Sequence, residues 1–183
     1  MPADKNILGK IRPFLPAALG VLGVAILLTL LSIPADKVSL AAGSPAPEFE
    51  MTDLAGDSVK LSDYSGRVVL IDFWATWCIT CEKEVPGLKT LYKENTGRPF
   101  ELLAASVDEG DPSAVGAFAV KQKLPWRVVF ATKRSVENYK VFGLPAKFLI
   151  DQNGILIKSY QPDTPLEEIG TDIRRLLNQE KTG

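Results

Sequence analysis

The chain has 183 residues, 46% of them hydrophobic, which is enough for one ordinary domain with a sizeable core and additional segments. Its 21 basic and 22 acidic residues leave a formal net charge of −1, so nothing favours nucleic acid as a partner. Histidine is absent, which excludes nucleophiles and metal sites that need histidine. Two cysteines alone cannot complete a four-ligand zinc site, and we expect no metal.

The first predicted element is an apolar segment near the N-terminus. No charged residue occurs from Pro13 to Ala35, and the 20 residues from Phe14 to Ile33 are almost all apolar. A helix rises about 1.5 Å per residue, so this run matches the roughly 30 Å of a bilayer core. Basic residues precede the run, and the positive-inside rule then places residues 1–12 in the cytoplasm and the chain after Ala35 outside.

We interpret residues 13–35 as a transmembrane anchor, followed by a Pro-, Ala-, Ser- and Gly-rich linker over residues 36–47. A cleaved signal peptide has the same charge pattern, and Ser39–Gly43 offers small residues for cleavage, but the apolar run exceeds the usual length of about 7–15 residues. A buried core helix is the third interpretation. The anchor predicts a single-pass protein of the cell inner (cytoplasmic) membrane, with its domain, residues 48–183, on the periplasmic side.

The domain itself is predicted to be α/β. The run Arg67–Ala75 is nearly continuous in apolar and β-branched residues, which is typical of a strand buried on both faces. A helical spacing of apolar residues follows at Cys81–Asn95, and a second strand at Phe100–Val107. A further helix is expected with Asp111 as its N-cap and Pro112 as its first residue. This order predicts parallel strands joined by a right-handed crossover.

The second half of the domain has a different pattern. A short strand at Trp126–Phe130 precedes two strand-like runs, Ala146–Asp151 and Ile155–Tyr160, which an Asn-Gly pair separates as in a β-hairpin. An amphipathic helix is expected over Pro165–Gln179. Together the elements predict a central mixed sheet flanked by helices, with an N-terminal hairpin extension near Phe49–Gly66.

The two cysteines of the chain occupy the junction between the first long strand and its helix. Cys78 lies where the helix is expected to start, and the unpaired N–H groups of a first turn stabilise a thiolate and lower its pKa. Cys81 follows on nearly the same face, within reach of a disulfide. The junction predicts a redox-active disulfide as the only redox group, with no further cofactor. A purely structural disulfide and two unrelated core cysteines remain alternatives.

Several motifs carry a family resemblance. The segment DFWATWCITC, Asp72–Cys81, resembles the active-site segment of thioredoxins. The wider pattern resembles membrane-anchored TlpA/ResA-type thiol–disulfide oxidoreductases: an N-terminal anchor, APEF at the domain start, LSDYSGRVVLIDFWATWC, and then GLPAKFLIDQNG. The resemblance extends over about residues 45–178 and implies a thioredoxin-like fold.

The resemblance also implies roles for single residues. Cys78 matches the exposed nucleophile and Cys81 the buried resolving cysteine. Asp72 matches the buried carboxylate of thioredoxins, and burial would raise its pKa and suit it to accept the Cys81 proton. A solvent-facing aspartate in a strand is the alternative. Glu109 falls where ResA-like members carry an active-site glutamate, and a solvated acidic loop is the alternative there.

Further matches surround the cysteines. Trp74 and Trp77 match the tryptophans that flank the site, and Pro86 matches the proline that kinks the active-site helix. Pro145 matches the cis-proline that faces the disulfide, and the backbone of Leu144 would then pair with an extended substrate segment. The resemblance therefore implies that Trp77, Leu144 and Pro145 bind substrate, and that Trp74 and Pro86 are structural.

Two departures from the family pattern stand out. Thr80 precedes the second cysteine, where many relatives have proline, and this bears on the reduction potential. Ala146 and then Lys147 follow Pro145, where many relatives have threonine directly after the proline. The second departure bears on substrate preference and leaves the class of reaction unchanged.

The combined features predict an extracytoplasmic reductase that keeps chosen protein cysteines reduced, for example those of apocytochrome c during cytochrome c biogenesis. Its electrons would come from a membrane reductant of the transmembrane thiol-relay type. The alternatives are a disulfide-forming oxidase of the same fold and a non-catalytic thioredoxin-like binding module. A peroxidase is disfavoured, because Ile71 and Ala75 occupy the Pro and Thr positions of the expected Pro-x-x-x-Thr-x-x-Cys pattern.

Overall fold

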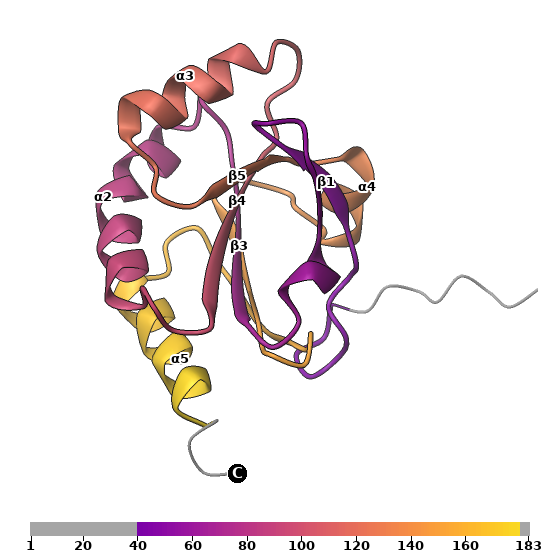
Figure 1. Cartoon of the computed structure of the whole chain (residues 1–183), viewed down its shortest axis with the longest axis vertical. Helices are drawn as coiled ribbons and strands as arrows, with labels where there is room; N and C mark the ends of the chain where they lie inside the picture. The colour runs from indigo at the N-terminus through magenta and orange to yellow at the C-terminus, as the bar shows by residue number, and fades with distance from the viewer. Residues whose placement is uncertain (1–39, 180–183) are drawn as a thin grey trace, which may run out of the picture. The chain divides into compact units, whose positions relative to one another are not determined.

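A computed structural model describes residues 40–179 (Figure 1). The predicted cytoplasmic tail, the transmembrane anchor and residues 36–39 of the linker lie outside this range, so what we infer about them stays a prediction. Between residues 40 and 179, no helix is both long enough and apolar enough to cross a membrane.

A seven-stranded mixed sheet forms the centre of the domain, in the order β2-β1-β5-β4-β3-β6-β7 (Figure 1). Strand β4 is parallel to both β3 and β5, whereas β6 is antiparallel to both β3 and β7. These pairings confirm the predicted β-α-β unit and the C-terminal hairpin. The strands are β1 (Glu50–Asp53), β2 (Ser58–Lys60), β3 (Val68–Trp74), β4 (Phe100–Ser106), β5 (Arg127–Phe130), β6 (Ala146–Ile150) and β7 (Leu156–Tyr160).

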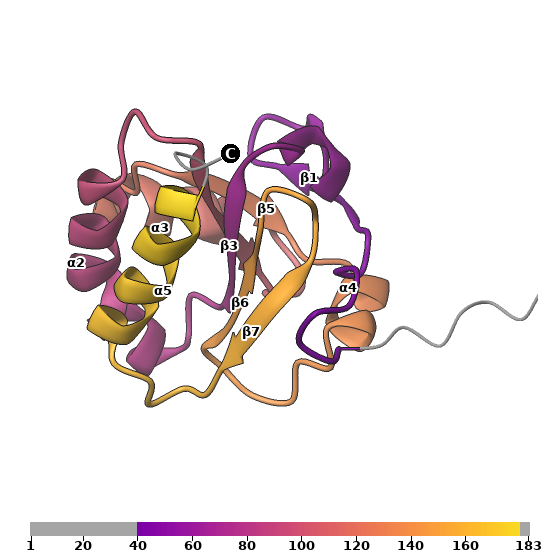
Figure 2. The same ribbon diagram turned by 90° about the horizontal axis from the view of Figure 1, so that it is seen from below.

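Helices cover both faces of this sheet (Figure 2). Helices α2, α3 and α5 pack on one face and α4 lies on the other, which confirms the predicted central sheet flanked by helices. The helices are α2 (Ile79–Glu94), α3 (Ser113–Gln122), α4 (Lys133–Asn138) and α5 (Leu166–Gln179), and a 3-10 turn, η1 (Leu61–Tyr64), follows β2.

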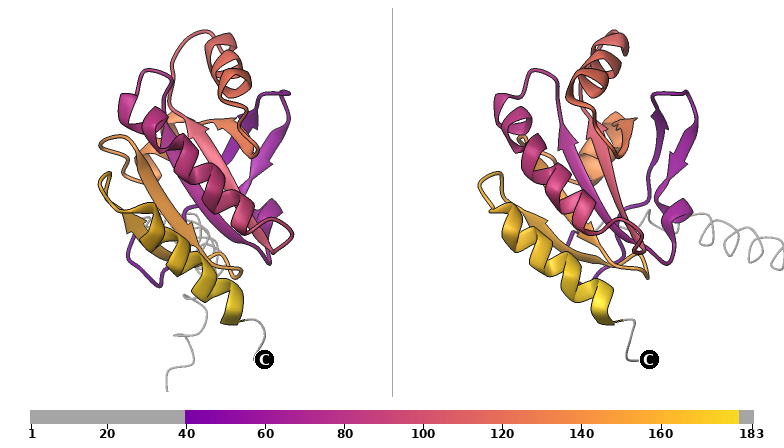
Figure 3. Two further views of the ribbon diagram at one scale, coloured as in Figure 1. Left: turned by 90° about the vertical axis from the view of Figure 1, so that its left-hand side faces the viewer. Right: turned by 60° about the vertical axis from the view of Figure 1, so that its left-hand side comes forward.

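Strand β3 is buried along its whole length, and its residues alternate between two cores. Leu70 belongs to the core beneath α2, α3 and α5, and Ile71 belongs to the core on the α4 side. Asp72 therefore points to the α2 side. Helices α2 and α5 lie side by side on that face (Figure 3), and a Cβ atom at Gly87 would lie only 2.5 Å from Cδ1 of Leu166.

Helix α4 is absent from the predicted elements. It begins after Thr132, whose hydroxyl accepts a hydrogen bond from the N–H of Ser135, while the Ser135 hydroxyl accepts one from the N–H of Thr132. The fully buried Tyr139 ends the helix and packs its ring 5.6 Å from that of Phe73, between centroids. Six residues are too few for helical periodicity to be visible, so only the Thr-x-x-Ser cap could have indicated this helix.

Helix α3 starts one residue later than predicted. Pro112 is its N-cap and not its first residue, so the prediction of Asp111 as the N-cap is wrong. The Asp111 carboxylate nevertheless accepts hydrogen bonds from the N–H and the hydroxyl of Ser113, and these bonds lower its pKa. An aspartate can thus satisfy an N–H of the first turn from one position further back.

The N-terminal part of the domain is joined to the sheet at two places. Strands β1 and β2 pair antiparallel, and β1 also pairs with β5, so they extend the central sheet. Before them, the N–H of Gly43 donates to the carbonyl of Leu156, and the N–H of Leu156 donates to the carbonyl of Ser44. The last part of the predicted linker is therefore attached to the start of β7.

Candidate active site

The two cysteines form a disulfide at the point where β3 leads into α2. Cys78 is the N-cap of α2, and the Cα atoms of Cys78 and Cys81 are 5.3 Å apart. The N–H of Cys81 donates a hydrogen bond to Sγ of Cys78 at 3.2 Å. In the reduced protein this donor and the positive end of α2 stabilise a thiolate at Cys78.

The surface beside the disulfide is apolar. Cys78 is 8% exposed and Cys81 is 5% exposed, so the contrast implied by the resemblance, an exposed and a buried cysteine, is small in the disulfide form. The residues on either side of Cys78 in the sequence are far more exposed to solvent: Trp77 is 68% exposed and Ile79 is 70% exposed. Large apolar side chains in contact with water on either side of Cys78 provide a surface on which another protein can pack.

A carboxylate from the next strand holds the loop that precedes Cys78. Asp108, which follows β4, accepts hydrogen bonds from the N–H of Thr76 at 2.9 Å and from its hydroxyl at 2.5 Å. The hydroxyl of Ser106 donates a further bond to Asp108 at 2.8 Å. Asp108 in the acidic loop after β4 therefore has a structural role, because it positions the residues before the disulfide.

We expect Asp108→Ala to lower the free energy of unfolding by about 1–3 kcal/mol, because the partly buried N–H and hydroxyl of Thr76 lose their acceptor. Urea unfolding of the oxidised protein measures this change. Glu109→Ala is the matched control from the same exposed loop and should leave the stability unchanged. Equal stability of the two variants would contradict the structural role of Asp108.

Asp72 of β3 is a titratable residue that lies beside the cysteine pair. It is only 5% exposed, and burial raises its pKa from 3.8 to about 6, with a further rise from Glu84 and an opposing effect from Lys147. A solvent-facing Asp72, the alternative left open by the sequence, does not occur. A carboxyl group with a pKa near 6 can exchange protons with its surroundings near neutral pH.

Asp72 shares a small cavity with Cys81. The cavity has a volume of about 10 Å³, which is close to the space that one water molecule needs. Oδ1 of Asp72 accepts no hydrogen bond from a residue in the described range, and its charged neighbour is the ammonium group of Lys147, 3.4 Å away. Other residues that line the cavity are apolar or aromatic: Trp74, Val85, Leu88, Ala104, Phe118, Leu124 and Trp126.

The buried Lys147 and the partly buried Glu84 complete the group of charges around Asp72, and neither was predicted as part of the site. Lys147 lies opposite Asp72 in the β3–β6 pairing and is 3% exposed. Its ammonium nitrogen is 3.4 Å from Oδ1 of Asp72 and 2.5 Å from Oε2 of Glu84. A lysine inside the otherwise apolar run Ala146–Ile150 was the available signal, because a buried lysine needs an acidic partner.

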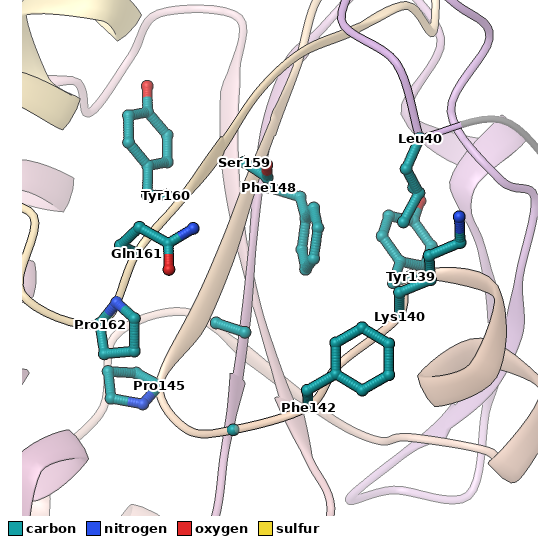
Figure 4. A pocket seen from close by; sticks show the side chains of 12 residues that line it. Leu40, Tyr139, Lys140, Phe142, Pro145, Phe148, Ser159, Tyr160, Gln161 and Pro162 are labelled. Atoms are coloured by element: carbon teal, nitrogen blue, oxygen red, sulfur yellow. The ribbon is translucent and has the colours of Figure 1, made fainter.

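The loop before β6 contains a cis peptide bond between Leu144 and Pro145, as predicted. Because β6 runs antiparallel to β3, this loop lies at the end of the sheet where β3 leads to the disulfide. The backbone N–H and C=O of Leu144 make no hydrogen bond with another residue between 40 and 179. Beside Pro145 opens a cavity of about 430 Å³ (Figure 4), at whose rim Phe142 is 93% exposed.

The remaining predicted residues have less direct positions. Trp74 is buried and packs against Phe118 with ring centroids 4.8 Å apart and planes tilted by 40°, and Pro86 is an exposed residue inside α2. Glu109 is exposed, and its side chain forms no hydrogen bond or ion pair with a described residue. Its catalytic role stays a prediction, and the carboxylate that approaches Asp72 is Glu84. No group of three metal-ligating side chains occurs among residues 40–179.

Comparisons with known proteins agree with this arrangement. The AhpC/TSA family model matches residues 42–159. The thiol-disulfide oxidoreductase ResA of Geobacillus kaustophilus (strain HTA426) is 42% identical over 121 residues, which cover 65% of this chain and 68% of that protein. The family model alone spans nearly all of the sheet described above.

Two crystal structures extend the likeness to the fold. A putative thiol:disulfide interchange protein DsbE from Chlorobium tepidum has a TM-score of 0.70 and 30% identity, covering 76% of this chain and 99% of that chain. The thioredoxin domain of a thiol-disulfide oxidoreductase from Bacteroides vulgatus has a TM-score of 0.69 and 29% identity, with the same coverage. With its cysteine pair at the start of α2, the chain belongs to the AhpC/TSA family and is a ResA-type thiol–disulfide oxidoreductase with a thioredoxin-like fold.

Proposed function

We propose that this oxidoreductase works as a reductase of disulfides in extracytoplasmic proteins, with apocytochrome c among its substrates. The position of the Cys78–Cys81 pair supports thiol–disulfide exchange most directly, since the N-terminus of α2 stabilises the Cys78 thiolate that attacks a substrate disulfide. The ResA name of its relatives agrees with such a role.

The reaction moves two electrons from the protein to its substrate in two exchanges. First, the Cys78 thiolate attacks one sulfur of the substrate disulfide; that bond breaks, a mixed disulfide forms, and the first substrate sulfur leaves and takes a proton. Then the Cys81 thiol loses its proton and attacks the Cys78 sulfur. The Cys78–Cys81 disulfide forms, and the second substrate sulfur leaves as a thiolate.

Asp72 accepts the proton of Cys81 in the second exchange. Both residues line the same small cavity, and the carboxyl pKa of about 6 leaves Asp72 mostly ionised at neutral pH yet basic enough to take a proton. When the protein is reduced again, the protonated Asp72 returns the proton to the leaving Cys81 sulfur. Asp72 thus serves as general base in one direction and general acid in the other.

Substrate binding is assigned to the apolar rim of the site. An extended segment around the substrate cysteine pairs with the unpaired backbone groups of Leu144, next to Pro145, in the manner of an added strand. The exposed indole of Trp77 packs on the same segment. This binding mode recognises the backbone of the substrate more than its side chains, so it suits a reductase with several protein substrates.

The proposed cellular location of the domain is inferred from the N-terminal segment of the sequence. We place the anchor at residues 13–35 in the cytoplasmic membrane and the catalytic domain on the periplasmic side, because the apolar run has the length of a bilayer core and follows basic residues. Reducing power then has to arrive through the membrane, from a reductant of the transmembrane thiol-relay type. A dithiol facing an oxidising compartment needs such a supply.

An oxidase that forms disulfides would use the same residues in the reverse direction. The reduction potential distinguishes an oxidase from a reductase. For a reductase we expect a glutathione redox titration of the full-length protein to give a value near thioredoxin's, about −270 mV. A value near about −120 mV would instead identify an oxidase. The variant Thr80→Pro is a useful companion, because it restores the residue common in relatives and reports how strongly position 80 sets the potential.

A further inference from the structure

A buried lysine separates two carboxylates beside the active-site disulfide. Lys147 of β6 is 3% exposed, and its ammonium group lies 2.5 Å from Glu84 of α2 and 3.4 Å from Asp72 of β3. The two distances differ in kind: Lys147 donates a hydrogen bond to Glu84, whereas Oδ1 of Asp72 accepts no hydrogen bond from a described residue. Lys147 therefore makes its short hydrogen bond with Glu84 and a longer ion pair with Asp72.

The charges of this group add up differently in its two protonation states. With all three groups ionised, one cation and two anions leave a net charge of −1 in a buried place. When Asp72 takes up a proton, the Lys147–Glu84 pair remains and the net charge is zero, which burial favours. Of the side chains lining the cavity around Asp72, only Cys81 can also titrate, so these four groups make up the local charge balance.

We propose that Glu84 and Lys147 are positioning residues that act in opposite directions on Asp72: Glu84 engages the ammonium group of Lys147, and this leaves Asp72 free to take up the proton of Cys81. Without Glu84, the full charge of Lys147 would hold Asp72 in its ionised form and weaken it as a base. Without Lys147, two uncompensated carboxylates would hold Asp72 in its protonated form. The consequence for catalysis rests on the proposed function.

The experiment measures the pKa of Asp72 directly, by ¹³C NMR of its carboxyl carbon in the oxidised full-length protein, where the disulfide removes the cysteines from the titration. We expect Glu84→Gln to lower this pKa and Lys147→Gln to raise it, each by on the order of one pH unit. The double variant Glu84→Gln/Lys147→Gln should lie between the two single variants. If Lys147→Gln does not fold, comparing the double variant with Glu84→Gln still isolates the effect of Lys147.

Lys158 offers a matched control. It also lies between two carboxylates, 2.6 Å from Glu168 and 3.2 Å from Asp172, but its side chain is 41% exposed and belongs to β7. Lys158→Gln should therefore leave the pKa of Asp72 unchanged. A change as large as that in Lys147→Gln would overturn the inference, because the effect would then not depend on the buried contacts.

The pH profile of single-turnover reduction supplies the second readout. The acid limb, where the rate rises as Asp72 ionises, should move to lower pH in Glu84→Gln, in step with the NMR value. An unchanged or raised Asp72 pKa in Glu84→Gln overturns the inference, whatever the activity of Asp72→Asn. If the pKa of Asp72 shifts as expected in Glu84→Gln and Lys147→Gln, the inference is supported. If Asp72→Asn nevertheless turns over at the wild-type rate, only the role of Asp72 as the base for Cys81 in the proposed function is overturned.

Discussion

Replacing Cys81 with alanine is expected to stop turnover at the mixed disulfide. Cys78 keeps its activation in this variant, because the hydrogen bond to its sulfur comes from the backbone N–H of residue 81 and the helix N-terminus remains. The first exchange therefore proceeds, but no second thiol resolves the product. We expect one substrate molecule bound per protein molecule, and no catalytic cycle.

Mass spectrometry under non-reducing conditions measures this trapping, first with a small-molecule disulfide and then with cell extracts that contain the full-length variant. Cys78→Ala is the matched control and should trap nothing, because Cys81 lacks the N-cap position that activates Cys78. Equal trapping by the two variants would show that both cysteines can attack the substrate, and stronger trapping by Cys78→Ala would show that their roles are reversed. Substrate proteins recovered through Cys81→Ala would also test apocytochrome c as a partner.

Replacing Asp72 with asparagine is expected to slow resolution of the mixed disulfide by about 10²-fold at neutral pH, the usual contribution of a general base. Attack by Cys78 should be nearly unaffected, because Asp72 lines the cavity at Cys81. Rapid-quench kinetics separate the two exchanges. A wild-type rate of the second exchange in Asp72→Asn would exclude Asp72 as the base.

The same substitution should raise stability, with a defined pH dependence. Because burial raises the pKa of Asp72 from 3.8 to about 6, the native protein holds this proton more tightly than the unfolded chain, and wild-type stability falls as the pH rises from about 4 to 6. A rise of about two pH units corresponds to roughly 3 kcal/mol. Above pH 6 the free energy of unfolding of Asp72→Asn should thus exceed that of the wild type by up to about 3 kcal/mol. Below pH 4, where Asp72 is protonated in both the folded and the unfolded wild type, the free energies of unfolding of the two proteins should change with pH in parallel.

This stability gain has a structural condition. Lys147 keeps its hydrogen bond to Glu84 after Asp72→Asn, so the substitution leaves no unpaired buried charge. Urea unfolding of the oxidised protein at pH 4 and pH 8 measures the difference. A loss of stability at pH 8 would mean that Asp72, and not Glu84, is the partner that Lys147 requires.

The strands and long helices were predictable from local patterns. Strand β3 was visible as a continuous apolar run, because a strand covered on both faces has no polar side to alternate with. The predicted start of α3 was off by one residue and α4 was missed, since the ends of helices and single turns depend on caps of a few residues. The cis bond before Pro145 followed only from the family resemblance, because most X-Pro bonds in folded proteins are trans.

The sequence by itself determined the reaction centre, because its parts are adjacent in the chain: Cys78 and Cys81 are one helical turn apart, and the strand before them ends four residues earlier. Only the tertiary structure decided the electrostatic surroundings. Asp72, Glu84 and Lys147 come from a strand, a helix and a second strand, and their meeting depends on the register of β3 with β6 and on the face that α2 turns to the sheet. Side chains distant in sequence acquire their pKa values from burial and from each other, and both exist only in the folded chain.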